Sequence, residues 1–188
     1  MKHIYIPLLA FATCYATQAM AKVSDLLPRP QVIQTTQGVS PFMLKRDICL
    51  TDPTNDPTLL RFLHDTGCTN TPSASAKIVV EMVETITNSY DYPLNGFDNE
   101  AYSITITPNE VHIKAIKPIG VTRAAQTLAQ LAEGYDNGQT PALEALSMTD
   151  WPAFKLRGWM QDVGRSFLSF NELKKEIDLL SRFKVNVL

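Results

Sequence analysis

The residues with the clearest chemical potential lie close together near the C-terminal end of the sequence. Arg157 precedes Gly158, and Asp162 and Arg165 follow a few residues later. A guanidinium offers several fixed N–H donors, which suit either a carboxylate or adjacent hydroxyl groups. On residue type alone, Arg157 is expected to pair with a carboxylate where two domains meet. Asp162 and Arg165 form an i, i+3 pair that is expected to brace a loop, with direct ligand binding as the open alternative.

The other reactive side chains are scattered. His64 and His112 stand alone, so no metal-ligand spacing is present, and neither a metal nor another cofactor is expected. Cys49 and Cys68 could form a disulfide in an oxidising compartment. The alternative is that they are two small buried hydrophobic side chains. Both readings of the cysteines stay open.

The first 21 residues are typical of a signal peptide. Lys2 supplies the positive start, residues 4–16 are an apolar run, and Ala19-Met20-Ala21 offers a small-x-small cleavage site. The run is too short for a stable membrane span. The protein is therefore expected to be exported, either to the periplasm or as a secreted protein. Lipoprotein anchoring through Cys14 is the weaker alternative, because Phe11-Ala12-Thr13 is a poor approach to a lipidated cysteine.

The charge balance excludes one class of partner. The formal net charge is −2, and removal of Lys2 with the signal peptide would make it −3. Phosphate contacts need clustered Lys and Arg, and the sequence has no basic stripe. Nucleic acid is therefore not an expected partner, whereas neutral sugars are compatible with this surface.

The elements that must position these residues can be predicted from periodicity and caps. Helices are predicted over residues 56–67, with Asp56 as N-cap and Gly67 at the end, and over residues 121–133, with Gly134 behind it. Strands are predicted over residues 77–84, 101–107 and 110–116, the last two forming an antiparallel hairpin through Pro108-Asn109. Residues 32–50 suit a meandering strand pair, and residues 88–99 a solvated loop. Residues 22–150 should thus form an α+β domain, an antiparallel sheet with helices on one face.

The tail, residues 151–188, has a different pattern. Residues 154–163 are apolar and extended, Ser169-x-x-Glu172 is a capping box that opens a helix, and residues 184–188 start another β-type run. Strand, helix and strand in this order predict a parallel βαβ unit with a right-handed crossover.

Two stretches resemble glycoside hydrolase family 20, the β-N-acetylhexosaminidases. The first comprises Ala101-Tyr102-Ser103-Ile104-Thr105-Ile106 and the run from Gly120-Val121-Thr122-Arg123 to Gln130-Leu131. The second runs from Asp150-Trp151-Pro152-Ala153-Phe154 through Arg157-Gly158 and Asp162 to Arg165, and then to Lys184-Val185-Asn186-Val187. The resemblance implies an accessory domain over residues 22–150 and, over residues 151–188, the first βαβ portion of a catalytic TIM (β/α)8 barrel.

The resemblance also implies an activity. Family members remove terminal non-reducing N-acetyl-D-hexosamine from glycans by a substrate-assisted retaining mechanism, which uses an adjacent Asp-Glu pair on a later barrel strand. No such pair lies in this chain, and Glu172 and Glu176, on a predicted helix, do not fit that role. The resemblance assigns Arg157 to the hydroxyl groups of the sugar. Ser166 stands where many relatives carry a larger polar residue, which puts any contact made there in doubt.

The length sets the last expectation. A (β/α)8 barrel needs eight units and about 250 residues, whereas residues 151–188 hold only one helix between two strand-like runs. The chain is therefore expected to be the N-terminal part of a longer glycosidase and to be inactive alone. The alternative is a non-catalytic, carbohydrate-associated module left by truncation.

Overall fold

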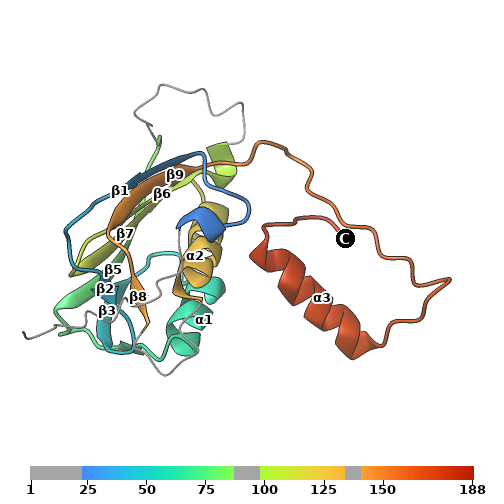
Figure 1. Cartoon of the computed structure of the whole chain (residues 1–188), viewed down its shortest axis with the longest axis horizontal. Helices are drawn as coiled ribbons and strands as arrows, with labels where there is room; N and C mark the ends of the chain where they lie inside the picture. The colour runs from blue at the N-terminus through green and yellow to red at the C-terminus, as the bar shows by residue number, and fades with distance from the viewer. Residues whose placement is uncertain (1–22, 87–97, 134–140) are drawn as a thin grey trace, which may run out of the picture.

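The computed structural model describes residues 23–86, 98–133 and 141–188. The predicted signal peptide, Cys14, Gly134 and most of the predicted loop over residues 88–99 lie outside these ranges. A twisted sheet, two helices on one of its faces and a tail with a third helix make up the described chain (Figure 1). Figure 1 shows α1 and α2 between the sheet and α3. Within the described residues, no helix has the length and apolar character needed to cross a membrane.

Seven strands form the main sheet, in the order β1-β9-β6-β7-β5-β3-β4, and β2 and β8 form a separate pair. The strands are β1 (Val32–Thr35), β2 (Phe42–Met43), β3 (Asp47–Thr51), β4 (Thr69–Asn70), β5 (Ala76–Met82), β6 (Tyr102–Ile106), β7 (Glu110–Ala115), β8 (Ala142–Leu143) and β9 (Leu146–Asp150). The helices are α1 (Pro57–Asp65), α2 (Pro118–Ala132) and α3 (Phe170–Arg182), with short 3-10 turns η1 (Val23–Asp25) and η2 (Asp98–Glu100).

The predicted hairpin over residues 101–116 is confirmed. Strands β6 and β7 pair antiparallel, from Tyr102 opposite Ala115 to Ile106 opposite Val111. At the turn, the Thr107 N–H donates to the Glu110 carbonyl at 2.8 Å. Alternate side chains of both strands are buried, as the period-2 pattern indicated.

The prediction of an antiparallel sheet is wrong for half of it. Strands β7 and β5, β5 and β3, and β3 and β4 pair in parallel. The physical reason is the connection: α1 carries the chain from the end of β3 back to the start of β4, so both strands run the same way. The observed fold is a mixed seven-stranded sheet covered by helices.

The strand pair predicted within residues 32–50 is also wrong. This stretch holds three strands, and each pairs with a distant partner: β1 with β9, β2 with β8, and β3 with β4 and β5. Alternation of apolar residues marks a half-buried strand but carries no information about which strand lies beside it.

Local signals placed the helix ends correctly for α1. The Asp56 carboxylate accepts hydrogen bonds from the backbone N–H groups of Thr58 and Leu59, both at 2.9 Å. Gly67 follows the helix with a positive φ of 68°, and its N–H donates to the His64 carbonyl. Helix α2 begins at Pro118, three residues before the predicted start, because proline is favoured in the first helical turn.

The core lies between the sheet and the inner faces of α1 and α2. Its fully buried members include Ile48, Ile78, Ile104, Ile113 and Leu128. Gly120 lets α2 approach closely, since a Cβ there would stand 2.6 Å from the Ala101 carbonyl oxygen. Cys49 and Cys68 are free thiols in this structure, and both are half-buried and not fully buried as the unpaired alternative expected.

Candidate functional site at the domain junction

The two segments that flank α3 lie beside each other. Gly158 and Val187 form a single parallel β-bridge, the Asn186 N–H donates to the Arg157 carbonyl at 2.9 Å, and the Trp159 N–H donates to the Val187 carbonyl at 3.0 Å. The two regular strands predicted here are thus reduced to one bridge and its flanking hydrogen bonds. Their parallel direction, with a helix between them, agrees with the predicted order.

Arg157 lies at this bridge, with its side chain 17% exposed. One terminal nitrogen of its guanidinium donates to Glu100 Oε2 at 2.5 Å. The Nε atom donates to the Lys184 carbonyl, and the other terminal nitrogen donates to the Phe154 carbonyl, each at 2.8 Å. The structure therefore holds the carboxylate pair at the junction that residue type alone favours.

Glu100 joins Arg157 to the domain of residues 23–151. Its Oε2 atom also accepts from Arg123 Nε of α2 at 2.7 Å. Burial by itself raises the pKa of Glu100, but the hydrogen bonds from Arg157 and Arg123 outweigh it, and the pKa lies below its ordinary value. One ionised carboxylate thus binds two guanidinium groups from different parts of the chain.

A second buried cluster lies beside Glu100 and Arg157. Lys184 Nζ donates to Asp150 Oδ2 and to the Tyr102 hydroxyl, both at 2.7 Å. The Tyr102 hydroxyl in turn donates to Asp150 Oδ2 at 2.8 Å and lies 2.6 Å from Thr127 Oγ1. Burial lowers the pKa of Lys184, partly opposed by the charge of Asp150, and burial raises the pKa of Tyr102. The cluster ties the tail to β6, β9 and α2.

Sequence reasoning missed Glu100, Lys184, Tyr102 and Asp150 as members of a junction site. One signal was present: Tyr102 and Asp150 both fall on the inward face of their strands, where polar groups need partners. They lie directly opposite each other in the β6–β9 register. The inward position of the Asp150 carboxylate at the end of β9 therefore predicts a cationic partner. It does not indicate which Lys or Arg side chain supplies the charge.

The predicted pair of Asp162 and Arg165 is confirmed. Their side chains form an ion pair, and Asp162 Oδ1 accepts from the backbone N–H groups of Gly164 and Arg165. The hydrogen bonds from Arg165 and Gly164 lower the pKa of Asp162. Ser166 is exposed nearby. The predicted capping box is confirmed as well, because Ser169 and Glu172 bond reciprocally at the start of α3. These residues fix the loop and the helix end.

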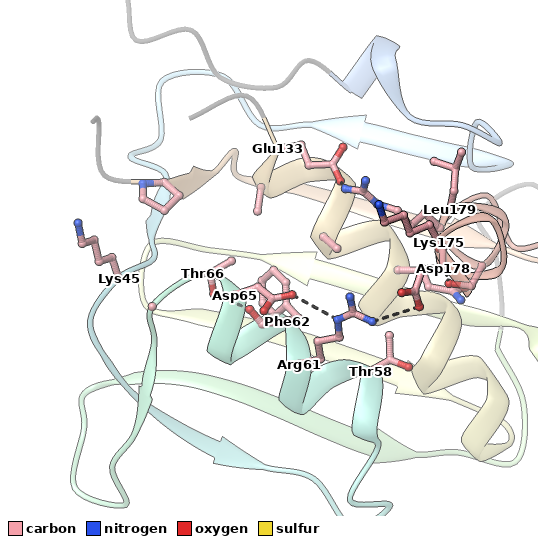
Figure 2. Close-up of a pocket in the computed structure, with 17 residues that line it drawn as sticks. Lys45, Thr58, Arg61, Phe62, Asp65, Thr66, Glu133, Lys175, Asp178 and Leu179 are labelled. Atoms are coloured by element: carbon pink, nitrogen blue, oxygen red, sulfur yellow. Dashed lines mark hydrogen bonds and ion pairs between the residues drawn. The ribbon is translucent and has the colours of Figure 1, made fainter. Parts of the chain in front are cut away.

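A cavity of about 1180 Å³ opens between α3 and the two helices on the sheet. Figure 2 shows Arg61 between Asp65 and Asp178, and Glu133 and Lys175 also line the cavity. Arg61 lies 3.5 Å from Asp178, and Arg182 pairs with Glu133, so ion pairs join α3 to α1 and α2 on both sides. No cluster of metal-ligating side chains occurs in the described part of the chain. The ion pairs across this cavity make it a junction between helices.

Two family models match the chain in succession. The model "Glycosyl hydrolase family 20, domain 2" matches residues 23–151, and the model "Glycosyl hydrolase family 20, catalytic domain" matches residues 154–188. The boundary between the two matches falls where the sheet ends and the tail begins. Arg157, Lys184 and the bridge at Gly158 all lie in the second match.

Individual relatives cover less of the chain. A β-N-acetylhexosaminidase from Cellulomonas fimi is 37% identical over 90 residues, which is 48% of this chain and 18% of the relative. β-Hexosaminidase A from Caenorhabditis briggsae is 33% identical over 96 residues, or 51% of this chain and 17% of the relative. The chain thus spans about a fifth of the length of the relatives it matches.

Solved structures share the fold at low identity. A family 20 exo-β-N-acetylglucosaminidase from Vibrio harveyi, in complex with N-acetylglucosamine, matches with a TM-score of 0.69 and 23% identity, over 89% of this chain and 25% of that one. An N-acetyl-β-hexosaminidase from Streptomyces plicatus matches with a TM-score of 0.67 and 22% identity, over 88% and 34%. Because the domain 2 model alone covers more than half of the sequence, this chain belongs to glycosyl hydrolase family 20.

Proposed function

We propose that this chain supplies domain 2 and the opening βαβ unit of the (β/α)8 barrel of an exported β-N-acetylhexosaminidase. The enzyme would remove terminal non-reducing N-acetyl-D-hexosamine from glycans by a substrate-assisted, retaining mechanism. The support is the succession of two family 20 matches, the hexosaminidase names of the relatives, and the bound N-acetylglucosamine in the Vibrio harveyi structure. Export rests on the signal-peptide pattern of residues 1–21.

The observation that carries the proposal is the placement of Arg157. It lies at the start of the catalytic-domain match, and three protein acceptors from separate parts of the chain hold its guanidinium. A guanidinium has five N–H donors, and the described residues occupy three of them. Two donors in a fixed plane remain, an arrangement that suits a pair of neighbouring sugar hydroxyls.

The chemical step is assigned to residues outside this chain. In the substrate-assisted mechanism, a Glu protonates the leaving oxygen while an Asp orients the acetamido group that attacks the anomeric carbon, an exception to the usual two-carboxylate scheme. We assign both to a later barrel strand of the whole protein. Glu172 caps α3 and Asp162 binds Arg165, so we assign neither residue a role in catalysis. Within this chain, Arg157 is the substrate-binding residue.

Grafting tests the proposal. Residues 23–188 would replace the corresponding leading part of the Cellulomonas fimi relative, and hydrolysis of 4-nitrophenyl N-acetyl-β-D-glucosaminide would be measured. Arg157→Lys keeps a cation beside Glu100 but loses the planar fork. We expect it to lower kcat/KM roughly 10- to 100-fold, because hydrogen bonds to charged groups contribute about 1.5–3 kcal/mol each.

Arg165→Lys is the matched control, since that side chain is 91% exposed and braces only its own loop. We expect the control to retain nearly full activity. Equal activity of the Arg157→Lys and Arg165→Lys grafts would contradict a sugar-binding role for Arg157. A graft that folds and binds N-acetylglucosamine but never turns over substrate would favour a non-catalytic module instead.

A further inference from the structure

Lys184 is the one buried residue between positions 152 and 188, a stretch that the structure describes in full. It is 5% exposed, although it follows directly on an exposed helix end. A lysine is almost never buried without a partner, because the charged form loses its hydration. Its burial therefore points to a specific task for the ammonium group.

The side chain of Lys184 enters the domain of residues 23–151. Its ammonium donates to Asp150 at the end of β9 and to Tyr102 at the start of β6, both at 2.7 Å, and lies 5.0 Å from the centre of the Tyr102 ring. Asp150 also accepts from the Gln31 backbone N–H at 3.3 Å, and Tyr102 contacts Thr127 of α2. The acceptors are thus fixed by three different elements.

The backbone of Lys184 has a second task. Its carbonyl accepts the hydrogen bond from Arg157 Nε at 2.8 Å. The residue has a φ of +60°, in the left-handed region that residues other than Gly, Asn and Asp seldom adopt. With this backbone conformation, one residue binds domain 2 through its side chain and Arg157 through its carbonyl.

We infer that Lys184 is a positioning residue for the sugar site: its ammonium, held by Asp150 and Tyr102, fixes the carbonyl that aims the guanidinium of Arg157. The inference rests on the proposed role of Arg157 in sugar binding. It gives domain 2 a part in substrate recognition without any contact between domain 2 and the sugar. If Lys184 only held the tail against domain 2, replacing Lys184 would not change the position of the Arg157 guanidinium in molecules whose tail remained bound.

The first experiment follows the Arg157 side chain in the chain itself. In ¹⁵N-arginine-labelled protein, the Nε–H signal of Arg157 is identified by its loss in Arg157→Lys, and its exchange with water is measured. We expect slow exchange in the unaltered chain and exchange at least tenfold faster in Lys184→Met, because the carbonyl acceptor is no longer held. Lys174→Met, at an exposed position of α3 that does not line the cavity, is the control and should change nothing.

The Arg123 Nε–H signal reports whether the junction is intact, because Arg123 shares Glu100 with Arg157. If Lys184→Met also loses that signal, Asp150→Asn decides the question, since it keeps the lysine and an oxygen acceptor while removing the charge. Slow exchange at Arg157 in a variant that retains the Arg123 signal would overturn the inference.

The second experiment is a double-mutant cycle in the graft described above. We expect Lys184→Met to raise KM for the aryl glucosaminide roughly tenfold, with a smaller change in kcat, because a misplaced guanidinium binds the sugar poorly. Added to Arg157→Lys, it should have almost no further effect, since both changes remove the same interaction. Additive effects on KM would contradict positioning through Arg157.

The two experiments distinguish a failure of the inference about Lys184 from a failure of the proposed function. If Arg157→Lys leaves KM unchanged, the sugar-binding proposal fails, while the exchange measurement still shows whether Lys184 holds Arg157. If Arg157→Lys raises KM but Lys184→Met does not, the proposed function stands and the positioning role of Lys184 is wrong.

Discussion

Glu100 is the residue on which the two guanidinium groups of the junction meet. Arg123 comes from a helix of domain 2 and Arg157 from the catalytic-domain match, and both donate to the same oxygen, Oε2. Two cations at one carboxylate repel each other, so the arrangement depends on the full negative charge of Glu100. The junction is therefore more sensitive to this charge than to either arginine alone.

We predict that Glu100→Gln destabilises the chain by about 2 kcal/mol at neutral pH, because two poorly exposed guanidinium groups lose their shared counter-charge. The folded-state pKa of Glu100 lies below its ordinary value of 4.5, so the stabilisation from its charge is complete above that pH and is lost as pH falls through the lower value. Urea unfolding of both proteins from neutral pH to below 4.5 should show the difference shrinking.

Glu81→Gln is the control, since Glu81 also binds two basic side chains, His112 and Lys114, but at an exposed position on the sheet. We expect it to cost far less. A difference between the Glu100→Gln and unaltered proteins that stayed constant over the whole pH range would show that the charge of Glu100 is not what stabilises the junction.

Among single residues, the sequence singled out Arg157 as a candidate site residue but none of its partners. Arg157 has a motif around it that spans a domain junction, whereas Glu100 is 57 residues away along the chain and Lys184 is 27. Lys184 also looks like an ordinary helix-terminal cation, a type of residue that usually remains solvated. Its burial depends on acceptors from β6 and β9, Tyr102 and Asp150, which only the folded sheet brings together.

At the scale of elements, prediction worked where the signal is local. The cap of α1, the hairpin of β6 and β7 and the capping box of α3 each depend on residues within a few positions of one another. The direction of a strand and the identity of the strands beside it do not depend on such local signals. Asp47 of β3 pairs with Thr69 across α1, and Val32 of β1 pairs with Thr149 at the other end of the domain. Such pairings are decided by packing of the whole sheet.

Gly120 allows helix α2 to lie close against the sheet. A Cβ at this position would stand 2.6 Å from the Ala101 carbonyl oxygen and 3.1 Å from the Ala115 Cβ, and a carbonyl in the backbone cannot rotate away. We predict that Gly120→Ala destabilises the chain by roughly 2 kcal/mol in urea unfolding, the usual cost of overpacking a tight contact.

Gly164→Ala is the comparison, because its nearest neighbour would be Asp162 Oδ1 at 3.5 Å, an ordinary contact. It should leave the midpoint almost unchanged. Since α2 also carries Arg123 and Thr127, Gly120→Ala should accelerate exchange at the Arg157 Nε–H as well. A stable Gly120→Ala protein with an unaltered junction would mean that α2 has more room than the contacts indicate.

At the scale of the whole molecule, the two parts of the chain differ in what they bury. Residues 23–151 enclose a continuous core, whereas α3 has no buried residue and large apolar side chains of the tail face solvent. Met160 and Phe167 are 93% and 87% exposed. The tail is held to the sheet domain mainly by polar contacts: the cluster at Lys184, the ion pair of Arg157 with Glu100, the hydrogen bond from Gln130 to the Arg182 carbonyl and the ion pairs of α3.

We predict that limited chymotrypsin digestion cuts first within residues 152–169 and only later in the helices and strands of residues 23–151. Backbone without a regular hydrogen-bonding pattern opens at low free-energy cost, and Phe154, Trp159 and Phe167 offer exposed cleavage sites. The same apolar surface should make the chain associate, which sedimentation at rising concentration would detect. If the Lys184 cluster held the tail to the sheet domain strongly enough for both to open together, both parts would be cleaved at the same rate. No stable fragment of residues 23–151 would then accumulate. That outcome would mean that domain 2 and the tail unfold as one unit, with the buried lysine as the contact that makes them cooperative.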